Sequence, residues 1–132
     1  MARTASREQA PRHTLGRRGE AAAEAHLVAL GFRILARRHA CRFGEVDLIA
    51  EEGDCLCFIE VRTRRPGPVR PFETVGAKKQ RRVAAAALDY LVRKGEAAVG
   101  GRALRFDVVE VNVSADGALQ LDLCRDAFEA PE

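Results

Sequence analysis

Three acidic residues interrupt apolar segments that would otherwise be typical of buried β-strands. Glu45 and Asp47 lie in the run GEVDLIA, and Glu60 lies in the run CLCFIEVRT. Because successive side chains of a strand point to opposite faces, Glu45 and Asp47 share one face of the first run. Burying an unpaired carboxylate costs several kcal/mol. Something must therefore compensate for the charges of Asp47 and Glu60.

The residues alone leave two kinds of compensation open. In the first, a nearby arginine pairs with each acid, and Arg62 lies on the same strand face as Glu60. In the second, a divalent cation lies between Asp47 and Glu60, since Mg²⁺ takes oxygen ligands, keeps several waters and is often held by one or two carboxylates. The positions of the charges do not decide between these two interpretations.

A third carboxylate can join this pair from a helix. The pattern predicts a helix over residues 15–30, with Thr14 as its cap. Glu20 falls at the edge of the apolar stripe of this helix, so it can reach over the edge of a sheet toward the strand acids. Glu24, one turn later, points more toward solvent, where a salt bridge is the simplest expectation.

The elements that must position these acids follow from the apolar patterning. We predict helices over residues 15–30 and 77–94, and strands over residues 32–38, 44–50, 54–63, 104–113 and 119–124. The third strand is apolar on both faces up to Ile59, which is typical of a central strand. The Pro-rich segment 64–72 is predicted to be a loop and residues 95–101 a linker. The order predicts an α/β fold whose sheet begins with a hairpin.

Length and composition indicate one globular domain. The chain has 132 residues, of which 47% are hydrophobic and 31% charged, so it is not of the disordered class. We expect a basic arm over residues 1–13, a single domain over residues 14–128 and a tail over residues 129–132. No run approaches the roughly 20 apolar residues of a membrane span. The first residues lack the apolar segment of a secretory signal, so a cytoplasmic protein is expected.

The charge is distributed unevenly along the chain. Residues 1–94 carry 19 Lys and Arg against 11 Asp and Glu (net +8), whereas residues 95–132 carry 3 against 8 (net −5). A basic body is typical of a protein that binds a polyanion, although a mixed solvated surface explains the same numbers. With one Tyr, six Phe and no Trp, the chain lacks the aromatic platform that single-stranded nucleic acid stacks on.

Four cysteines allow a second kind of metal site. His39 and Cys41, with Cys55 and Cys57, could in principle bind zinc. The Cys-x-Cys spacing on a straight strand holds two sulfurs apart, however, so we expect the cysteines to be reduced and to pack as small apolar side chains.

Five segments of the chain resemble the YraN-like family of small bacterial proteins: GRRGEAAAEAHLVALGFRILARR, CRFGEVDLIAEEGDCLCFIEVRTRR, ETVGAKKQRRVAAAALDYL, RFDVVEV and CRDAF. That family is similar to archaeal Holliday-junction resolvases and to the restriction-endonuclease-like, or PD-(D/E)XK, superfamily. The resemblance covers about residues 14–128. It implies a restriction-endonuclease-like core, a mixed central sheet in the order α-β-β-β-α-β with an extra C-terminal strand, and flanking helices.

The resemblance also implies a nuclease site that uses Mg²⁺ or Mn²⁺. Asp47 and Glu60 match its strand acids, and Glu20 matches a helix glutamate that completes such sites. Arg62 stands where the superfamily has Lys. Because Arg stays charged, it can stabilise negative charge but cannot take a proton from water, so activation of the water is left to the metal. Gln80 is expected to support the ligands without touching the ion, and Glu45 either to do the same or to have a structural role.

Basic residues are expected to hold the phosphate backbone of duplex or branched nucleic acid, DNA rather than RNA. They are Arg17, Arg18, Arg37, Arg38, Arg64, Arg65, Lys78, Lys79, Arg81 and Arg82. No membrane partner is expected, and the resemblance to resolvases suggests a homodimer. Two alternatives stay open: a nucleic-acid-binding module with weak or no catalysis, and an interaction protein that uses the acidic residues 95–132.

Overall fold

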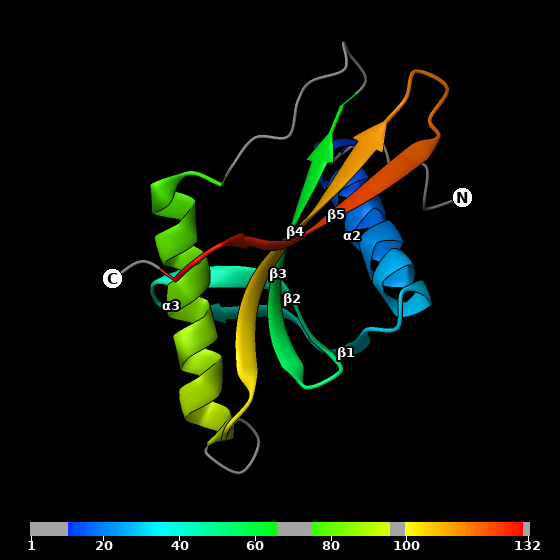
Figure 1. The fold of residues 1–132 in the computed structure, drawn as a ribbon. Helices are drawn as coiled ribbons and strands as arrows, with labels where there is room; N and C mark the ends of the chain where they lie inside the picture. Colours follow the sequence, from blue (N-terminus) through cyan, green and yellow to red (C-terminus); the bar gives the residue numbers. More distant parts are fainter. Residues whose placement is uncertain (1–10, 66–74, 96–99, 131–132) are drawn as a thin grey trace, which may run out of the picture.

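The computed structural model describes residues 11–65, 75–95 and 100–130 (Figure 1). Within these ranges the chain forms two helices and five strands. They are α2 (Pro11–Ala29), β1 (Arg33–Cys41), β2 (Gly44–Glu52), β3 (Cys55–Arg64), α3 (Ala77–Lys94), β4 (Ala103–Val113) and β5 (Leu119–Phe128). The predicted order of elements is confirmed.

The five strands form one mixed sheet in the order β1-β2-β3-β4-β5. β1, β2 and β3 are joined by tight turns and pair antiparallel, as does β5 with β4. β3 and β4 are parallel, and α3 makes the crossover between them. A parallel pair needs such a connection because the chain must return to the same end of the sheet.

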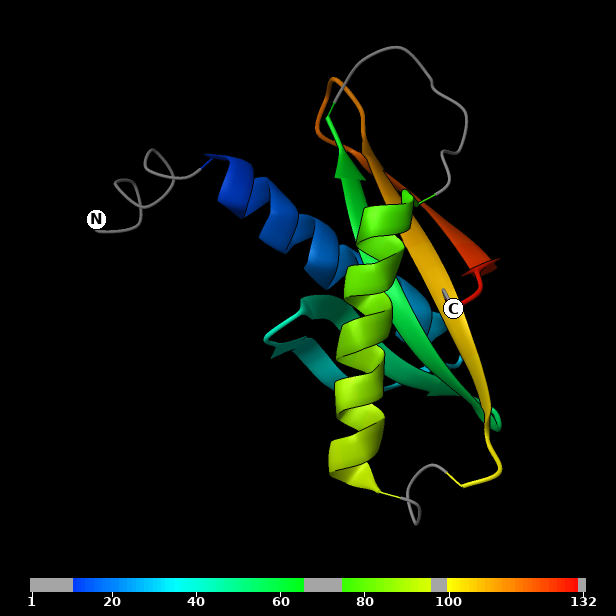
Figure 2. The same cartoon turned by 90° about the vertical axis from the view of Figure 1, so that its left-hand side faces the viewer.

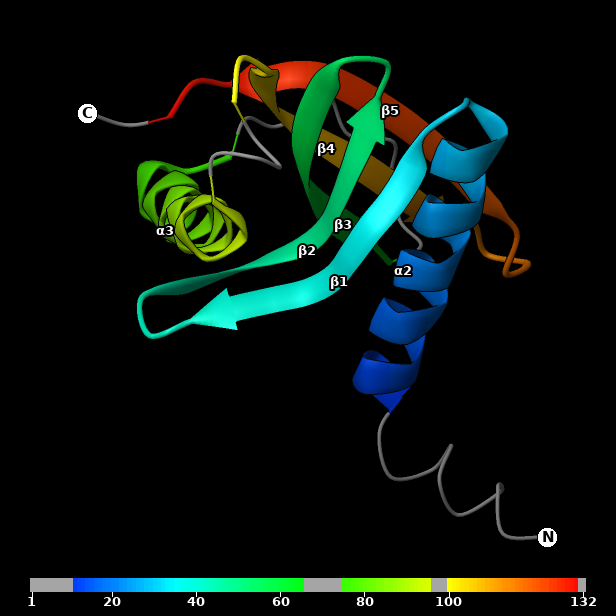
Figure 3. The same cartoon turned by 90° about the horizontal axis from the view of Figure 1, so that it is seen from below.

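The two helices cover opposite faces of this sheet (Figures 2 and 3). On the α2 face, Ala23 and Leu27 pack against strand residues that include Leu48 and Ile59. On the α3 face, the core contains Val83 together with residues such as Ile49 and Phe58. β3 is therefore buried on both sides, which confirms the prediction from its continuous apolar sequence.

The beginning of the first helix differs from the prediction. α2 begins at Pro11 rather than at residue 15, so Thr14 lies inside the helix and does not cap it. Proline is well tolerated in the first turn, because its missing N–H would have no partner there and its φ suits a helix. Residues 11–13 therefore belong to the helix and not to an arm. Residues 1–10, most of the predicted loop 64–72 and residues 96–99 lie outside the described part of the chain.

Both outer strands are longer than predicted. β1 extends to Cys41 and β5 extends to Phe128. Near the end of β5, the Arg125 guanidinium donates to both carboxylate oxygens of Glu52. A hydrophobic pattern does not reveal such an ionic contact. Among the described residues, neither helix is long and apolar enough to cross a membrane.

Candidate active site at the divergence of two strands

Asp47 and Glu60 lie at the point where β2 and β3 stop pairing. The ladder between these strands runs from Glu52 opposite Cys55 to Leu48 opposite Ile59 and ends there. Beyond it, Oδ2 of Asp47 accepts the backbone N–H of Val61 at 2.7 Å. The carboxylate thus replaces a backbone acceptor, and the two strands separate with one acid on each side of the opening.

The environment of Asp47 opposes its negative charge. Burial is the largest cause, and the charge of Glu60 is the second; together they raise the pKa of Asp47 from 3.8 to about 7. The hydrogen bond from Val61 acts in the opposite direction but is outweighed, and Glu20 adds a smaller unfavourable charge. Asp47 is therefore close enough to Glu60 and Glu20 for the negative charge of each to oppose its ionisation.

Glu60 is the most buried of these three acids. Its side chain is 6% exposed, and its Oε2 lies 2.8 Å from Nζ of Lys79 in the first turn of α3. This ion pair raises the pKa of Lys79, the hydrogen bond to Glu60 being the largest cause. Glu60 thus has a lysine of the crossover helix as an ion-pair partner, a pairing that the sequence does not suggest.

Two close backbone approaches bring α3 and α2 to the opening. A Cβ on Gly44 would lie 1.8 Å from the carbonyl oxygen of Arg82, so α3 rests directly on the start of β2. A Cβ on Gly19 would lie 2.0 Å from Oγ1 of Thr63, so α2 rests on the end of β3. Gly19 precedes Glu20, so this close packing places Glu20 near the acids of the opening.

Glu20 reaches the opening from α2 but is held by an arginine. Its Oε1 lies 2.8 Å from Nη2 of Arg38 on β1. Arg38 has a left-handed backbone, with φ at 49°. The pKa of its guanidinium is raised mainly by the Glu20 hydrogen bond and to a smaller extent by the charges of Glu45 and Asp47. Arg38 therefore lies at the edge of the acidic group instead of on a separate surface.

The remaining predicted site residues surround this group. Arg62 is half-buried on β3, and Glu45 is exposed on β2. Gln80 donates from Nε2 to the carbonyl oxygen of Val75 at 2.7 Å, which fixes the start of α3 beside Lys79. Its part is thus to hold the helix that carries Lys79.

The pair Asp47 and Glu60 fits a hard divalent cation. Among the residues that the structure describes, no group of three or more His, Cys, Asp or Glu side chains is gathered closely enough to hold a metal ion. Mg²⁺, however, is commonly bound through one or two carboxylates with waters in its other positions. A dication would stabilise two adjacent carboxylates that otherwise repel each other.

Several basic residues predicted to bind nucleic acid have partners in the protein. One of them is Arg64, whose side chain is only 13% exposed and lies 2.9 Å from the buried Glu110. Arg37 pairs with Glu24, as expected for that glutamate, and Arg18 donates to the carbonyl oxygen of Gly117. The other predicted backbone contacts are exposed: Arg17, Arg65, Lys78, Arg81 and Arg82.

The cysteines show the character expected of small apolar side chains. All four are free, and Cys57 is fully buried. Burial, with a smaller effect of the Asp107 charge, raises the pKa of the Cys57 thiol to about 12. It therefore stays protonated at neutral pH and is a poor metal ligand.

The position of Lys79 at Glu60 is the main feature that the sequence analysis missed. Lys79 was expected only as a backbone contact for nucleic acid. The available signal was topological: a crossover helix begins near the carboxyl end of the strand that precedes it, and Glu60 lies toward that end of β3.

Comparison with known proteins defines the family of the chain. The model of the uncharacterised protein family UPF0102 matches residues 19–111. The chain belongs to the UPF0102 family. A UPF0102 protein of Anaeromyxobacter sp. (strain Fw109-5) is 46% identical over 92% of this chain and 90% of its own. One of Symbiobacterium thermophilum is 47% identical over 88% of this chain and 97% of its own, and one of Geobacter sulfurreducens is 42% identical over 87% and 88%.

The stretch matched by the UPF0102 model begins at Gly19 and contains the whole acidic group. Glu20, Asp47 and Glu60 all lie inside it, as does Lys79. The resemblance to the YraN-like family is thereby confirmed at the level of the family.

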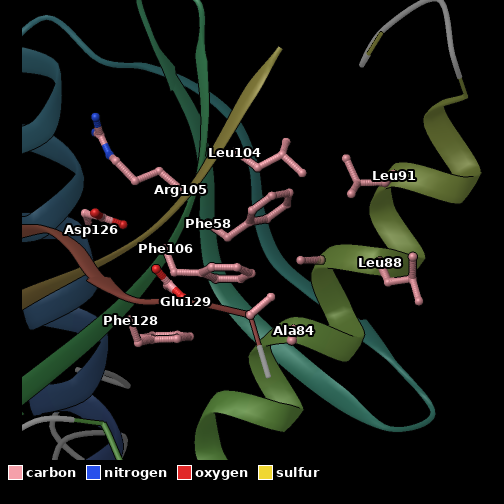
Figure 4. Close-up of a pocket in the computed structure, with 12 residues that line it drawn as sticks. Phe58, Ala84, Leu88, Leu91, Leu104, Arg105, Phe106, Asp126, Phe128 and Glu129 are labelled. Atoms are coloured by element: carbon pink, nitrogen blue, oxygen red, sulfur yellow. The ribbon is translucent and has the colours of Figure 1, made fainter. Parts of the chain in front are cut away.

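A separate hollow of about 520 Å³ lies between α3 and the strands β3, β4 and β5 (Figure 4). Phe58, Leu91 and Phe106 line it. None of the acids at the strand divergence lines this hollow, and part of its wall, including Phe128, lies beyond the stretch matched by the UPF0102 model. The hollow and the acidic group are therefore distinct features.

Proposed function

We propose that this UPF0102 protein is a metal-dependent nuclease that hydrolyses phosphodiester bonds of DNA. The observation that carries the proposal is the pair Asp47 and Glu60, held side by side where β2 and β3 separate, with the pKa of Asp47 raised to about 7. A carboxyl group with a perturbed pKa beside a second acid is typical of sites that bind a cation or move a proton.

The order of elements supports a restriction-endonuclease-like core. One helix, an antiparallel three-stranded unit, a crossover helix and a parallel strand follow one another, and an antiparallel strand extends the sheet. In the proposed assignment, β2 and β3 carry the two strand acids and α2 carries Glu20, in agreement with the resemblance to resolvases.

Asp47 and Glu60 would hold Mg²⁺ or Mn²⁺. A dication at this place would supply Lewis acidity toward the phosphate and would lower the pKa of a bound water. Glu20 contributes a third carboxylate once it leaves Arg38. Because a guanidinium group is a hydrogen-bond donor and not a proton acceptor, Arg62 would stabilise negative charge on the phosphate without taking a proton.

The exposed arginines and lysines support a nucleic acid as partner. Lys78, Arg81 and Arg82 lie on α3, and Arg17 lies on α2, the two helices that border the opening. Contacts of this kind position a duplex by its phosphates without reading bases. DNA with a branch or nick, bound by a homodimer as in resolvases, is the substrate that this proposal favours.

Cleavage of a branched or nicked duplex with Mn²⁺ tests the proposal. The wild-type protein should cleave, and Asp47→Ala should lose at least about 100-fold of the rate, because the substitution removes one of two carboxylates. Asp122→Ala, which removes an exposed acid on β5, is the matched control and should cleave like the wild type. Equal activity of the wild type and Asp47→Ala would remove the assignment.

The second candidate function is a nucleic-acid-binding module with weak or no catalysis. Arg62 favours it, because arginine cannot perform proton transfer that a lysine at this position could. This alternative predicts DNA binding whose affinity falls steeply with salt, without turnover and without any effect of Mn²⁺.

A further inference from the structure

Glu60 forms an ion pair with a cation from the crossover helix α3. Nζ of Lys79 lies 2.8 Å from Oε2 of Glu60, while the Glu60 side chain is 6% exposed. A carboxylate this deeply buried needs a partner in every state of the protein. Lys79 supplies that partner in a protein without a dication.

The two ends of Lys79 differ in freedom. Its backbone is fixed, since Gln80 binds the carbonyl oxygen of Val75 and the carbonyl oxygen of Arg82 contacts Gly44. Its side chain is 56% exposed, and the four-carbon chain of a lysine is flexible. The ammonium group can therefore reach Glu60 from an immobile base and can also leave it.

The other buried ion pair near this end of the sheet behaves differently. Arg64 and Glu110 are 13% and 6% exposed, so both partners are enclosed. If Arg64 moved into solvent, Glu110 would be left as a buried charge without this partner. The Lys79–Glu60 pair has one enclosed member and one mobile member, which is suited to exchange of the cation.

We infer that Lys79 is an internal counter-ion of the candidate site, which holds Glu60 in the absence of a dication and competes with the dication for that carboxylate. This inference rests on the proposed function for the identity of the competing ion. Its consequence is that the dication affinity of the protein is set below what Asp47 and Glu60 alone would give. Removing the ammonium group should therefore strengthen dication binding.

Titration calorimetry of the full-length protein with Mn²⁺ tests the inference. Lys79→Gln keeps a polar side chain and removes the positive charge. Lys78→Gln removes the same charge from the neighbouring exposed position, so it controls for the change in the net charge of the protein. Lys79→Gln should bind Mn²⁺ about fivefold more tightly than Lys78→Gln, the factor that corresponds to about 1 kcal/mol for an ion pair of this kind. Lys79→Arg keeps the charge and should bind no more tightly than the wild type.

The sign of the effect separates this role from a structural one. If Lys79 only supported the fold of the site, Lys79→Gln would bind Mn²⁺ more weakly than the control, and the inference would be overturned; equal affinity would overturn it as well. Thermal melts monitored by circular dichroism verify that each variant is folded. Tighter binding by Lys79→Gln in a protein that cleaves no DNA would refute the nuclease and leave the counter-ion in place. If neither Lys79→Gln nor Lys78→Gln binds Mn²⁺, both the counter-ion role of Lys79 and the metal-dependent nuclease are refuted.

Discussion

Replacement of Asp47 by asparagine should make the protein more stable in neutral and alkaline solution. The folded-state pKa of Asp47 is about 7, against 3.8 for the ordinary group. The folded protein therefore binds more protons than the unfolded chain between about pH 4 and pH 7, and the stability of the wild type falls as the pH rises through this window. Asp47→Asn removes the titrating group and with it this fall.

The magnitude follows from the size of the shift. A difference of about 3 pKa units, at about 1.4 kcal/mol each, is an upper limit of about 4 kcal/mol above pH 8. The amide oxygen of Asn can still accept the N–H of Val61, but its NH₂ group needs a partner, which costs about 1–3 kcal/mol where it fails to find one. This cost does not depend on pH. The advantage of Asp47→Asn over the wild type should thus grow by about 2–3 kcal/mol between pH 5 and pH 8.

Urea unfolding of both proteins at pH 5, 6, 7 and 8, in a chelator, measures this growth directly. Asp122→Asn, on the exposed side of β5, controls for loss of one negative charge and should follow the wild type at every pH. Stability profiles of wild type and Asp47→Asn that run parallel from pH 5 to pH 8 would show that Asp47 is ionised as easily as a surface residue. The conclusion that burial and the charge of Glu60 raise the pKa of Asp47 would then be refuted.

Three further predictions concern the elements around the site. Gly44→Ala should lower the free energy of unfolding by about 1–3 kcal/mol in urea, because its Cβ has no room beside α3, whereas the helical Gly16→Ala, which has open space, should not destabilise the protein. Arg64→Met should cost about 3–5 kcal/mol in the same assay by leaving Glu110 buried and unpaired, and Glu110→Gln in the same chain should recover part of the loss. Two arginines hold the pKa of Glu52 at about 2, so Glu52→Gln should cost up to about 1 kcal/mol at pH 7 and progressively less as the pH falls from about 4.5 toward 2.

Much of the fold could be predicted because its signals are local. The apolar run that ends at Ile59 defined a central strand, and the run 77–94 defined α3 to the residue. The beginning of α2 and the end of β5 were wrong by several residues. α2 begins with a proline in its first turn, and the end of β5 is held by the ion pair of Arg125 with Glu52. Neither feature is visible in the periodicity of hydrophobic residues.

The candidate site was predicted in its acids and missed in its cations. Asp47 and Glu60 stand out in the sequence because a carboxylate in an apolar strand demands an explanation. Their cationic neighbours do not stand out, because an arginine or lysine on a surface helix or an edge strand is ordinary. Arg64 is an example: the sequence predicts a contact with nucleic acid, and in the structure its side chain is enclosed with Glu110.

The sequence by itself determined the order of the helices and strands and showed that Asp47 and Glu60 interrupt apolar strands, since hydrophobic periodicity and the cost of burying charge act locally. Only the tertiary structure decided which cation meets which acid. Lys79 lies 19 positions after Glu60, and Arg38 lies 18 positions after Glu20. These pairs exist because a crossover helix returns to the carboxyl end of β3 and a strand edge passes beside α2, and long cationic side chains join whichever buried carboxylate the packing brings within their reach.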